Sequence, residues 1–186
     1  MQQYLIEDDA HYLHSRGVIQ LSGIGVIEVL QPLVTSSLAE LSKKSLLTYM
    51  LDEAGNVFAD MFVVRVKNSH RDDSLAEQIQ HAVTAADDTE KPEILLLDCA
   101  SSQLAQIIDL LAPQCESGDV SAVDVSAGWR VFAELPDQST FKVGEYIKYV
   151  DPRWHMGARL LRPASVAQSS QWQSELHWLA HVLRLG

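Results

Sequence analysis

The sequence is poor in cysteine and in basic residues, and it has no long apolar run. Only two cysteines occur in 186 residues, Cys99 and Cys115, and two cannot form the disulfide framework of a small secreted domain. Lysine and arginine number 14 against 25 aspartates and glutamates, so the formal net charge is -11. A chain this acidic has no bulk attraction for nucleic acid or for an anionic membrane surface. Without a signal-peptide-like or membrane-spanning segment, the sequence predicts a cytoplasmic protein that is not secreted.

The chain nevertheless contains enough apolar material for a folded core. Hydrophobic residues make up 47% of the sequence, which argues against wholesale disorder, and the length fits one domain of ordinary size or one and a fraction. The sequence contains no phosphate-binding glycine loop, no nucleophile-elbow serine and no dinucleotide-binding glycine pattern. It therefore does not predict the common nucleotide-binding and serine-hydrolase sites.

Strand and helix signals follow one another irregularly along the chain. Strands are predicted at 17–21, 45–51, 57–66, 93–98, 120–125, 129–135, 146–150 and 158–161. Helices are predicted over 24–31, within 67–92, over 104–113 and at the C-terminal end. We expect 45–51 to pair with 57–66, 120–125 with 129–135, and 146–150 with 158–161. This order predicts an α+β domain with a largely antiparallel sheet and helices packed on one side.

Local signals mark the ends of several of these elements. Ser22 is the predicted N-cap of the first helix, and Pro32 ends or kinks that helix because proline has no N–H group. Gly55 lies in the turn at 52–56, at the position that best tolerates a positive φ. The last helix has an apolar stripe at helical spacing, formed by Trp172, Leu176, Leu179 and Leu183.

Two histidines and two cysteines are the candidates for metal binding and nucleophilic chemistry. His177 and His181 lie four residues apart on the last helix, so both rings project from one face. No glutamate separates them in the metalloprotease pattern and no third ligand has a natural spacing, so a partly buried or surface role is favoured. Cys99 and Cys115 have no suggested histidine or aspartate partner, which favours packing over catalysis. No metal site is predicted.

Asp60 interrupts a predicted strand of large apolar residues. A carboxylate on a buried strand needs a partner or a functional reason, because burying it without compensation is costly. Alternation along the strand offers a second interpretation, in which Asp60 simply turns outward. The residues alone leave both interpretations open, and Asp60 is the candidate catalytic residue.

Three separated segments together resemble one protein family. Residues 16–38 read as a strand, a turn and a helix that ends in a Leu-Gln-x-Leu-x-Thr-Asn-like element, with Ser36 in place of the asparagine. The hairpin at 48–65 has a Leu-Asp-x-x-Gly turn followed by an acid and an arginine, at Asp52, Gly55, Asp60 and Arg65. Residues 150–163 contain an Asp-Pro-Arg element followed by Gly-x-Arg, at Asp151, Pro152, Arg153, Gly157 and Arg159. In this order the segments resemble the front half of a YgfZ-type folate-binding protein, a relative of the glycine-cleavage T-protein.

The resemblance implies a fold and a ligand. It implies a T-protein N-terminal-like domain over 16–186 with an acidic insertion at 67–92, preceded by a polar segment at 1–15. The C-terminal part of the family fold and its Lys-Gly-Cys-Tyr-x-Gly-Gln-Glu motif are expected to be absent. The implied ligand is tetrahydrofolate, and the residues implied to bind it are Asp60, Arg65, Arg153 and Arg159. T-protein relatives often carry two acids at the strand position, whereas here Ala59 precedes Asp60.

Three functions follow as expectations. The first is a YgfZ-type factor for iron–sulfur cluster assembly or repair, an accessory protein more than an enzyme. It would be linked to tRNA modification through iron–sulfur client enzymes, and it would reside in the mitochondrial matrix in a eukaryote. The second is an aminomethyltransferase-like enzyme that uses tetrahydrofolate, with Asp60 positioning or deprotonating a folate or amine group. The third is a ligand-free interaction module that recruits a partner or self-associates through exposed apolar surface.

Overall fold

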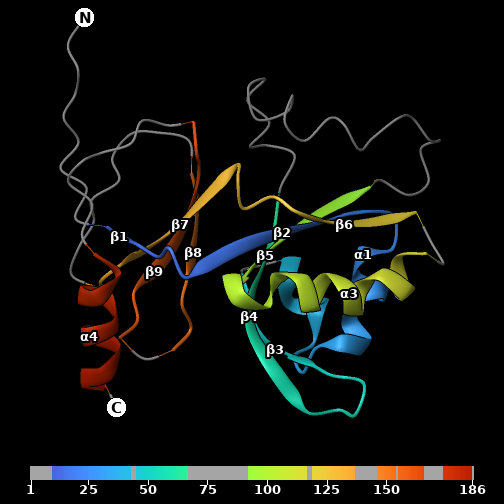
Figure 1. The fold of residues 1–186 in the computed structure, drawn as a ribbon, viewed down its shortest axis with the longest axis horizontal. Helices are drawn as coiled ribbons and strands as arrows, with labels where there is room; N and C mark the ends of the chain where they lie inside the picture. Colours follow the sequence, from blue (N-terminus) through green and yellow to red (C-terminus); the bar gives the residue numbers. More distant parts are fainter. Residues whose placement is uncertain are drawn as a thin grey trace, which may run out of the picture. The chain divides into compact units, whose positions relative to one another are not determined.

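The computed structural model describes residues 10–42, 45–66, 92–116, 119–136, 146–153, 155–165 and 174–185 (Figure 1). Its elements are β1 (His11–Tyr12), β2 (Arg16–Gly23), α1 (Val26–Leu30), the 3-10 turns η1 (Gln31–Leu33) and η2 (Leu38–Ser42), β3 (Leu46–Leu51), β4 (Val57–Arg65), β5 (Glu93–Ala100), η5 (Ser101–Gln103), α3 (Leu104–Cys115), β6 (Val120–Asp124), β7 (Trp129–Glu134), β8 (Ile147–Val150), β9 (Ala158–Pro163) and α4 (Glu175–Leu185). The predicted helix within 67–92 lies outside the described residues.

The chain forms two compact units. The central unit comprises Val18–Asp124, and the terminal unit comprises Met1–Gly17 with Val125–Gly186. The range predicted as one domain, 16–186, is thus divided between two units. Residues 10–15 of the predicted polar segment include β1, which pairs with β7 of the terminal unit.

The central unit contains a five-stranded sheet in the order β3-β4-β5-β2-β6. β3 and β4 form the predicted hairpin, antiparallel from Leu46 opposite Val63 to Met50 opposite Ala59, with a bulge before Leu51. β4 pairs with β5, and β2 pairs with β6, also antiparallel. This pairing confirms the predicted hairpin. The hairpin is predictable because its turn is local: the Asp52 carboxylate accepts hydrogen bonds from backbone N–H groups of the turn.

The core of the central unit lies between one face of this sheet and the helices α1 and α3. Side chains at alternate strand positions contribute to this core, among them Ile19, Leu21, Met50, Ala59, Met61, Val63, Leu95, Leu97 and Cys99. Val26 and Leu30 of α1 and Ile107 and Leu111 of α3 pack against them. This is the predicted arrangement of helices on one side of an antiparallel sheet, and the α+β class is confirmed.

The first helix begins later than predicted and has a different cap. Gly25 is its N-cap residue, with φ of 82° and no side-chain cap hydrogen bond. Ser22 instead lies within β2, where its hydroxyl is 3.1 Å from that of Ser121 on β6. Ser22 is not the predicted N-cap because β2 continues through Gly23, and Ser22 pairs with Ser121 within the sheet.

The terminal unit contains a second antiparallel sheet, in the order β1-β7-β9-β8, and the helix α4. β8 and β9 form the predicted pair, from Ile147 opposite Leu161 to Val150 opposite Ala158. The strands predicted at 120–125 and 129–135 exist, but they do not pair with each other. β6 pairs with β2 in the five-stranded sheet, whereas β7 pairs with β9 and β1 in the four-stranded sheet.

Candidate functional site

The face of the five-stranded sheet opposite to the helices carries Asp60. Alternation along β4 turns Ala59 and Met61 toward the helices and Asp60 and Phe62 to the other face. Asp60 is half-buried, while Phe62 is fully buried. Of the two interpretations of Asp60, alternation therefore explains why it is outside the helical core. Alternation does not make Asp60 an ordinary surface acid, because Phe62, its neighbour on that face, is fully buried.

A second carboxylate, Asp98, lies on the same face in the next strand. Asp98 of β5 is directly opposite Phe62 of β4, so it is the diagonal neighbour of Asp60, a separation of about 7–8 Å in a β-sheet. Its side chain is fully buried. On the other side of Asp60, Tyr49 of β3 is directly opposite and 44% exposed. These three side chains form a line across β3, β4 and β5, here named the Tyr49–Asp60–Asp98 row, that passes from an exposed aromatic ring to an enclosed acid.

Sequence reasoning missed Asp98. The run at 93–98 looks like a compact apolar strand that ends in an acid, but β5 continues to Ala100 and Asp98 is internal to it. The available signal was the same as for Asp60, a carboxylate within an apolar run that continues through Cys99 and Ala100. The row thus contains a second acid, Asp98, on the strand next to that of Asp60.

Arg65 does not share this face with Asp60. The two residues are five positions apart on β4, so Arg65 lies on the same face as Val63, the face of the helices. Its guanidinium forms an ion pair with Glu93 of β5, and both side chains are about one-third exposed. Arg65 is therefore engaged at the end of the hairpin, away from the row.

The Leu-Gln-x-Leu-x-Thr-Asn-like element supports Tyr49 from the outer edge of β3. The N–H of Thr35 donates to the Tyr49 carbonyl at 3.0 Å, and the Tyr49 N–H donates to the Thr35 hydroxyl at 3.2 Å. The Ser36 N–H donates to the Thr48 hydroxyl at 3.0 Å, and the Ser36 hydroxyl donates to the Leu47 carbonyl at 3.3 Å. Ser36 thus has a structural role: it closes a sheet edge.

The Asp-Pro-Arg and Gly-x-Arg residues form a separate cluster in the terminal unit. The buried Asp151 carboxylate accepts a bidentate pair of hydrogen bonds from Arg153, with Nε–Oδ1 and Nη2–Oδ2 distances of 2.8 and 2.6 Å. Arg159 Nε lies 3.7 Å from the same carboxylate, and its guanidinium is 5.4 Å from the centre of the Trp178 ring. The structure therefore brings Arg153 and Arg159 together on Asp151, in a cluster that fixes the loop between β8 and β9.

The histidine and cysteine candidates are engaged in packing contacts. The His181 ring donates a hydrogen bond to the His155 carbonyl at 3.0 Å, and the His177 ring lies 6.4 Å edge-on from that of His11. Cys99 belongs to the core of the central unit, and burial raises the pKa of the Cys115 thiol above its ordinary value of 9.0. Across the described stretches of the chain, no three His, Cys, Asp or Glu side chains gather in a group able to hold a metal ion.

The fold resembles that of a glycine-cleavage T-protein. The chain is similar to the glycine cleavage system aminomethyltransferase T from Bartonella henselae, with a TM-score of 0.58 and 11% sequence identity over 89% of this chain and 46% of that chain. At this identity the likeness shows the fold alone, and the chain spans less than half the length of that protein. No protein-family model and no curated protein matches the sequence. None of the helices in the described residues has the length and apolar character needed to cross a membrane.

Proposed function

We propose that the chain is an aminomethyltransferase-like, folate-binding domain whose ligand lies on the Tyr49–Asp60–Asp98 row. The observation that supports this proposal most strongly is the pair of carboxylates on adjacent strands, on the face away from the helices, in a T-protein-like fold. Asp60 would accept hydrogen bonds from ring and amino N–H groups of a pterin, since a carboxylate is an acceptor at both oxygens. Tyr49 would stack on the ring, and the fully buried Asp98 would act on the ligand only indirectly, from behind the row.

The row suits the head of tetrahydrofolate better than its tail. The pterin is planar and rich in N–H donors, which match the aromatic ring of Tyr49 and the partly exposed carboxylate of Asp60. The glutamate tail is anionic and calls for a cation, but the outward positions of the described strands β3, β4 and β5 carry no lysine or arginine. The proposed ligand class is therefore a reduced pterin or a cationic amine, and the tail contributes little to its binding.

Calorimetry tests this assignment with two ligands. We expect tetrahydrofolate and 6-methyltetrahydropterin, which lacks the tail, to bind with similar affinity. Asp60→Asn should weaken both by roughly tenfold or more, because a hydrogen bond to a charged group is lost. Asp98→Asn should have an effect of the same sign, and Asp109→Asn, an exposed acid of α3, should have none. The proposal would be overturned by the absence of binding at millimolar ligand, or by equal affinities of the wild type and Asp60→Asn.

A second candidate is a YgfZ-type iron–sulfur assembly or repair factor, with tetrahydrofolate as ligand and iron–sulfur proteins as partners in the cytoplasm or the mitochondrial matrix. The observation that favours it is the Asp151 cluster, since the Asp-Pro-Arg element that resembles this branch is built around one buried carboxylate. Complementation of a deletion strain tests it. Restored iron–sulfur enzyme activity with the wild-type chain, lost with Arg153→Ala, would support the role, and growth identical to the empty vector would exclude it.

A further inference from the structure

The helix α4 is anchored on the terminal unit through Glu175 and Trp178. The buried Glu175 carboxylate accepts hydrogen bonds from the backbone N–H of Ser15, at 3.1 Å, and from its hydroxyl. The same carboxylate lies 2.7 Å from His14 Nδ1. Trp178 is the large side chain that α4 buries, and its ring contacts the guanidinium of Arg159. Hydrogen-bond and cation–π contacts therefore hold this helix in place.

The apolar side of α4 faces outward. The side chains of Leu176, Leu179 and Leu183 are 72%, 46% and 82% exposed, and Ala180 between them is exposed as well. These four residues, here named the leucine stripe, have the i, i+3, i+4, i+7 spacing that an amphipathic helix ordinarily turns to its core. The structure thus reverses the usual orientation of the apolar stripe predicted from the sequence; Trp172, its fourth predicted member, lies outside the described residues.

The spacing of the leucine stripe makes it complementary to a second copy of itself. The spacing of the four positions is the same in both directions along the helix. A two-fold axis between Leu179 and Ala180 therefore maps each copy onto the other in an antiparallel helix pair. Leu176 of one copy then faces Leu183 of the second, and Leu179 faces Ala180. Large side chains opposite a small one let two helices approach closely and interdigitate.

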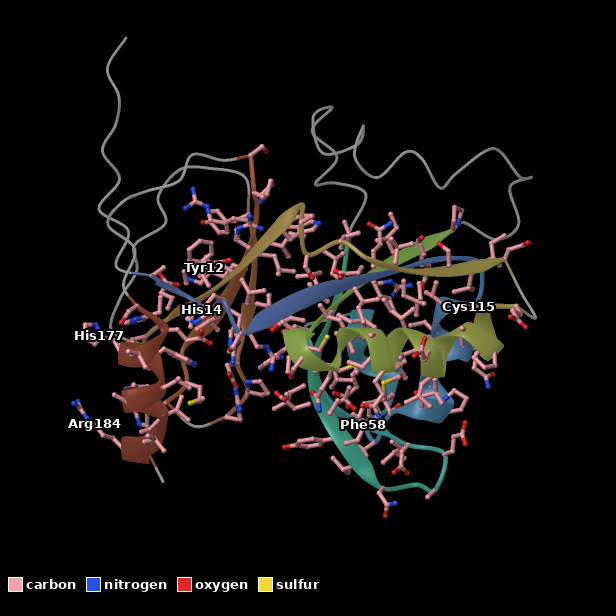
Figure 2. The ribbon with its side chains drawn as sticks, viewed as in Figure 1. Tyr12, His14, Phe58, Cys115, His177 and Arg184 are labelled. Carbon is pink, nitrogen blue, oxygen red and sulfur yellow. The ribbon has the colours of Figure 1, made fainter. Side chains whose placement is uncertain are left out.

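The charges around the stripe permit two copies to meet here. The exposed residues that flank it are His177 and Arg184, which project from the outer side of α4 in Figure 2, and no exposed acid lies within this helix. The chain as a whole carries a net charge of -11. Electrostatic repulsion therefore disfavours contact between two copies through their acidic surfaces. The leucine stripe has no exposed acid of α4 beside it, so this repulsion is weakest there.

We propose that two copies of this chain associate through their α4 helices, antiparallel, with the leucine stripe as the interface. Six exposed residues of α4 are available on each side, compared with roughly 20–30 in a standard interface. The pairing is therefore weak and concentration-dependent. It is independent of the proposed ligand site, since the row belongs to the central unit and the stripe to the terminal unit.

Sedimentation equilibrium from micromolar to millimolar concentration tests the dimer. We expect a reversible monomer–dimer equilibrium, whose dissociation constant Leu183→Lys raises roughly tenfold or more because a charge enters the apolar contact. Val57→Lys is the matched control, since Val57 is 58% exposed in the central unit and should leave the constant unchanged. Circular dichroism verifies that both variants are folded. A chain that is monomeric throughout, or a Leu183→Lys variant that dimerises like the wild type, would overturn the proposal.

Oxidative cross-linking tests the antiparallel geometry, in a Cys115→Ser background that removes the half-buried thiol. Leu179→Cys lies next to the proposed two-fold axis, so two copies should form a disulfide with each other. Leu176→Cys alone should cross-link poorly, whereas a mixture of Leu176→Cys and Leu183→Cys chains should give the mixed dimer. Efficient self-cross-linking of both Leu176→Cys and Leu183→Cys would indicate a parallel pair and overturn the antiparallel arrangement.

Discussion

Gly157 in the terminal unit leaves no room for a side chain. Its φ is 71°, and a Cβ atom added there would lie 2.0 Å from the Glu134 carbonyl oxygen. The Asp151 N–H donates to the Gly157 carbonyl at 3.1 Å, so this close approach helps to close the loop that carries the arginine cluster. Glycine is thus required here for its missing side chain as well as for its conformation.

Gly157→Ala is predicted to lower the free energy of unfolding by about 2–5 kcal/mol, because backbone strain and a steric clash act together. Urea denaturation monitored by circular dichroism measures it. Gly55→Ala is the control: Gly55 has a φ of 80° but no atom within 4 Å of the added Cβ, so strain alone should cost about 1 kcal/mol. Equal losses in the two variants would contradict the steric part of the argument.

The stability of the β3–β4 turn depends on pH through Asp52. Hydrogen bonds that its carboxylate accepts lower the pKa of Asp52 below the ordinary 3.8, first among them the one from the Asn56 N–H. A lowered pKa in the folded state means that the unfolded chain binds the proton first. The stabilisation is therefore complete well above pH 3.8 and is lost as the pH falls through the folded-state pKa.

Asp52→Asn, which keeps an acceptor and removes the charge, is predicted to be less stable than the wild type at pH 6. The difference should shrink as the pH falls from about 5 toward 2. Urea midpoints at several pH values measure it, and Glu53→Gln removes the same charge from the same turn as a control. A difference between Asp52→Asn and the wild type that does not change with pH would refute the coupling.

At the scale of elements, α4 buries Trp178 but leaves its leucine side chains exposed. Trp178→Ala is predicted to destabilise the protein by about 3 kcal/mol, because it removes a buried ring and its contact with Arg159. Leu183→Ala should stay within about 0.5 kcal/mol when measured at low protein concentration, since that side chain is 82% exposed. Thermal or urea unfolding distinguishes the two. A larger effect of Leu183→Ala than of Trp178→Ala would mean that α4 packs through its leucines.

The β3–β4 hairpin and the β6–β7 region show what a sequence predicts about pairing. The hairpin is predictable because the turn from Asp52 to Asn56 fixes its register within a few residues. β6 and β7 are also close in sequence, yet they belong to different sheets. Their partners β2 and β9 are selected by long-range packing, and local propensity contains no information about that choice.

At the scale of the whole molecule, the terminal unit is made from both ends of the chain. β1 pairs with β7, and the contact from Ser15 to Glu175 joins residues 160 positions apart. Deleting residues 1–15 is therefore predicted to raise amide hydrogen exchange in α4 by tenfold or more, because the helix loses its buried carboxylate's partners. The amides of α3, in the central unit, are the internal control. Unchanged protection of α4 in the truncated chain would contradict this role of the N-terminal segment.

The sequence by itself determined the local elements of this protein. Periodicity, proline and glycine placed the β3–β4 hairpin, the β8–β9 pair and the helical stretches, and motif order indicated a T-protein-like fold, because these signals act over a few residues. Only the tertiary structure decided which residues meet. It placed Asp98 beside Asp60, directed Arg65 to the other face of the sheet and turned the leucine stripe outward. Strand order and the packing of distant segments determine such contacts, and the free energy of burial that selects them depends on the whole fold.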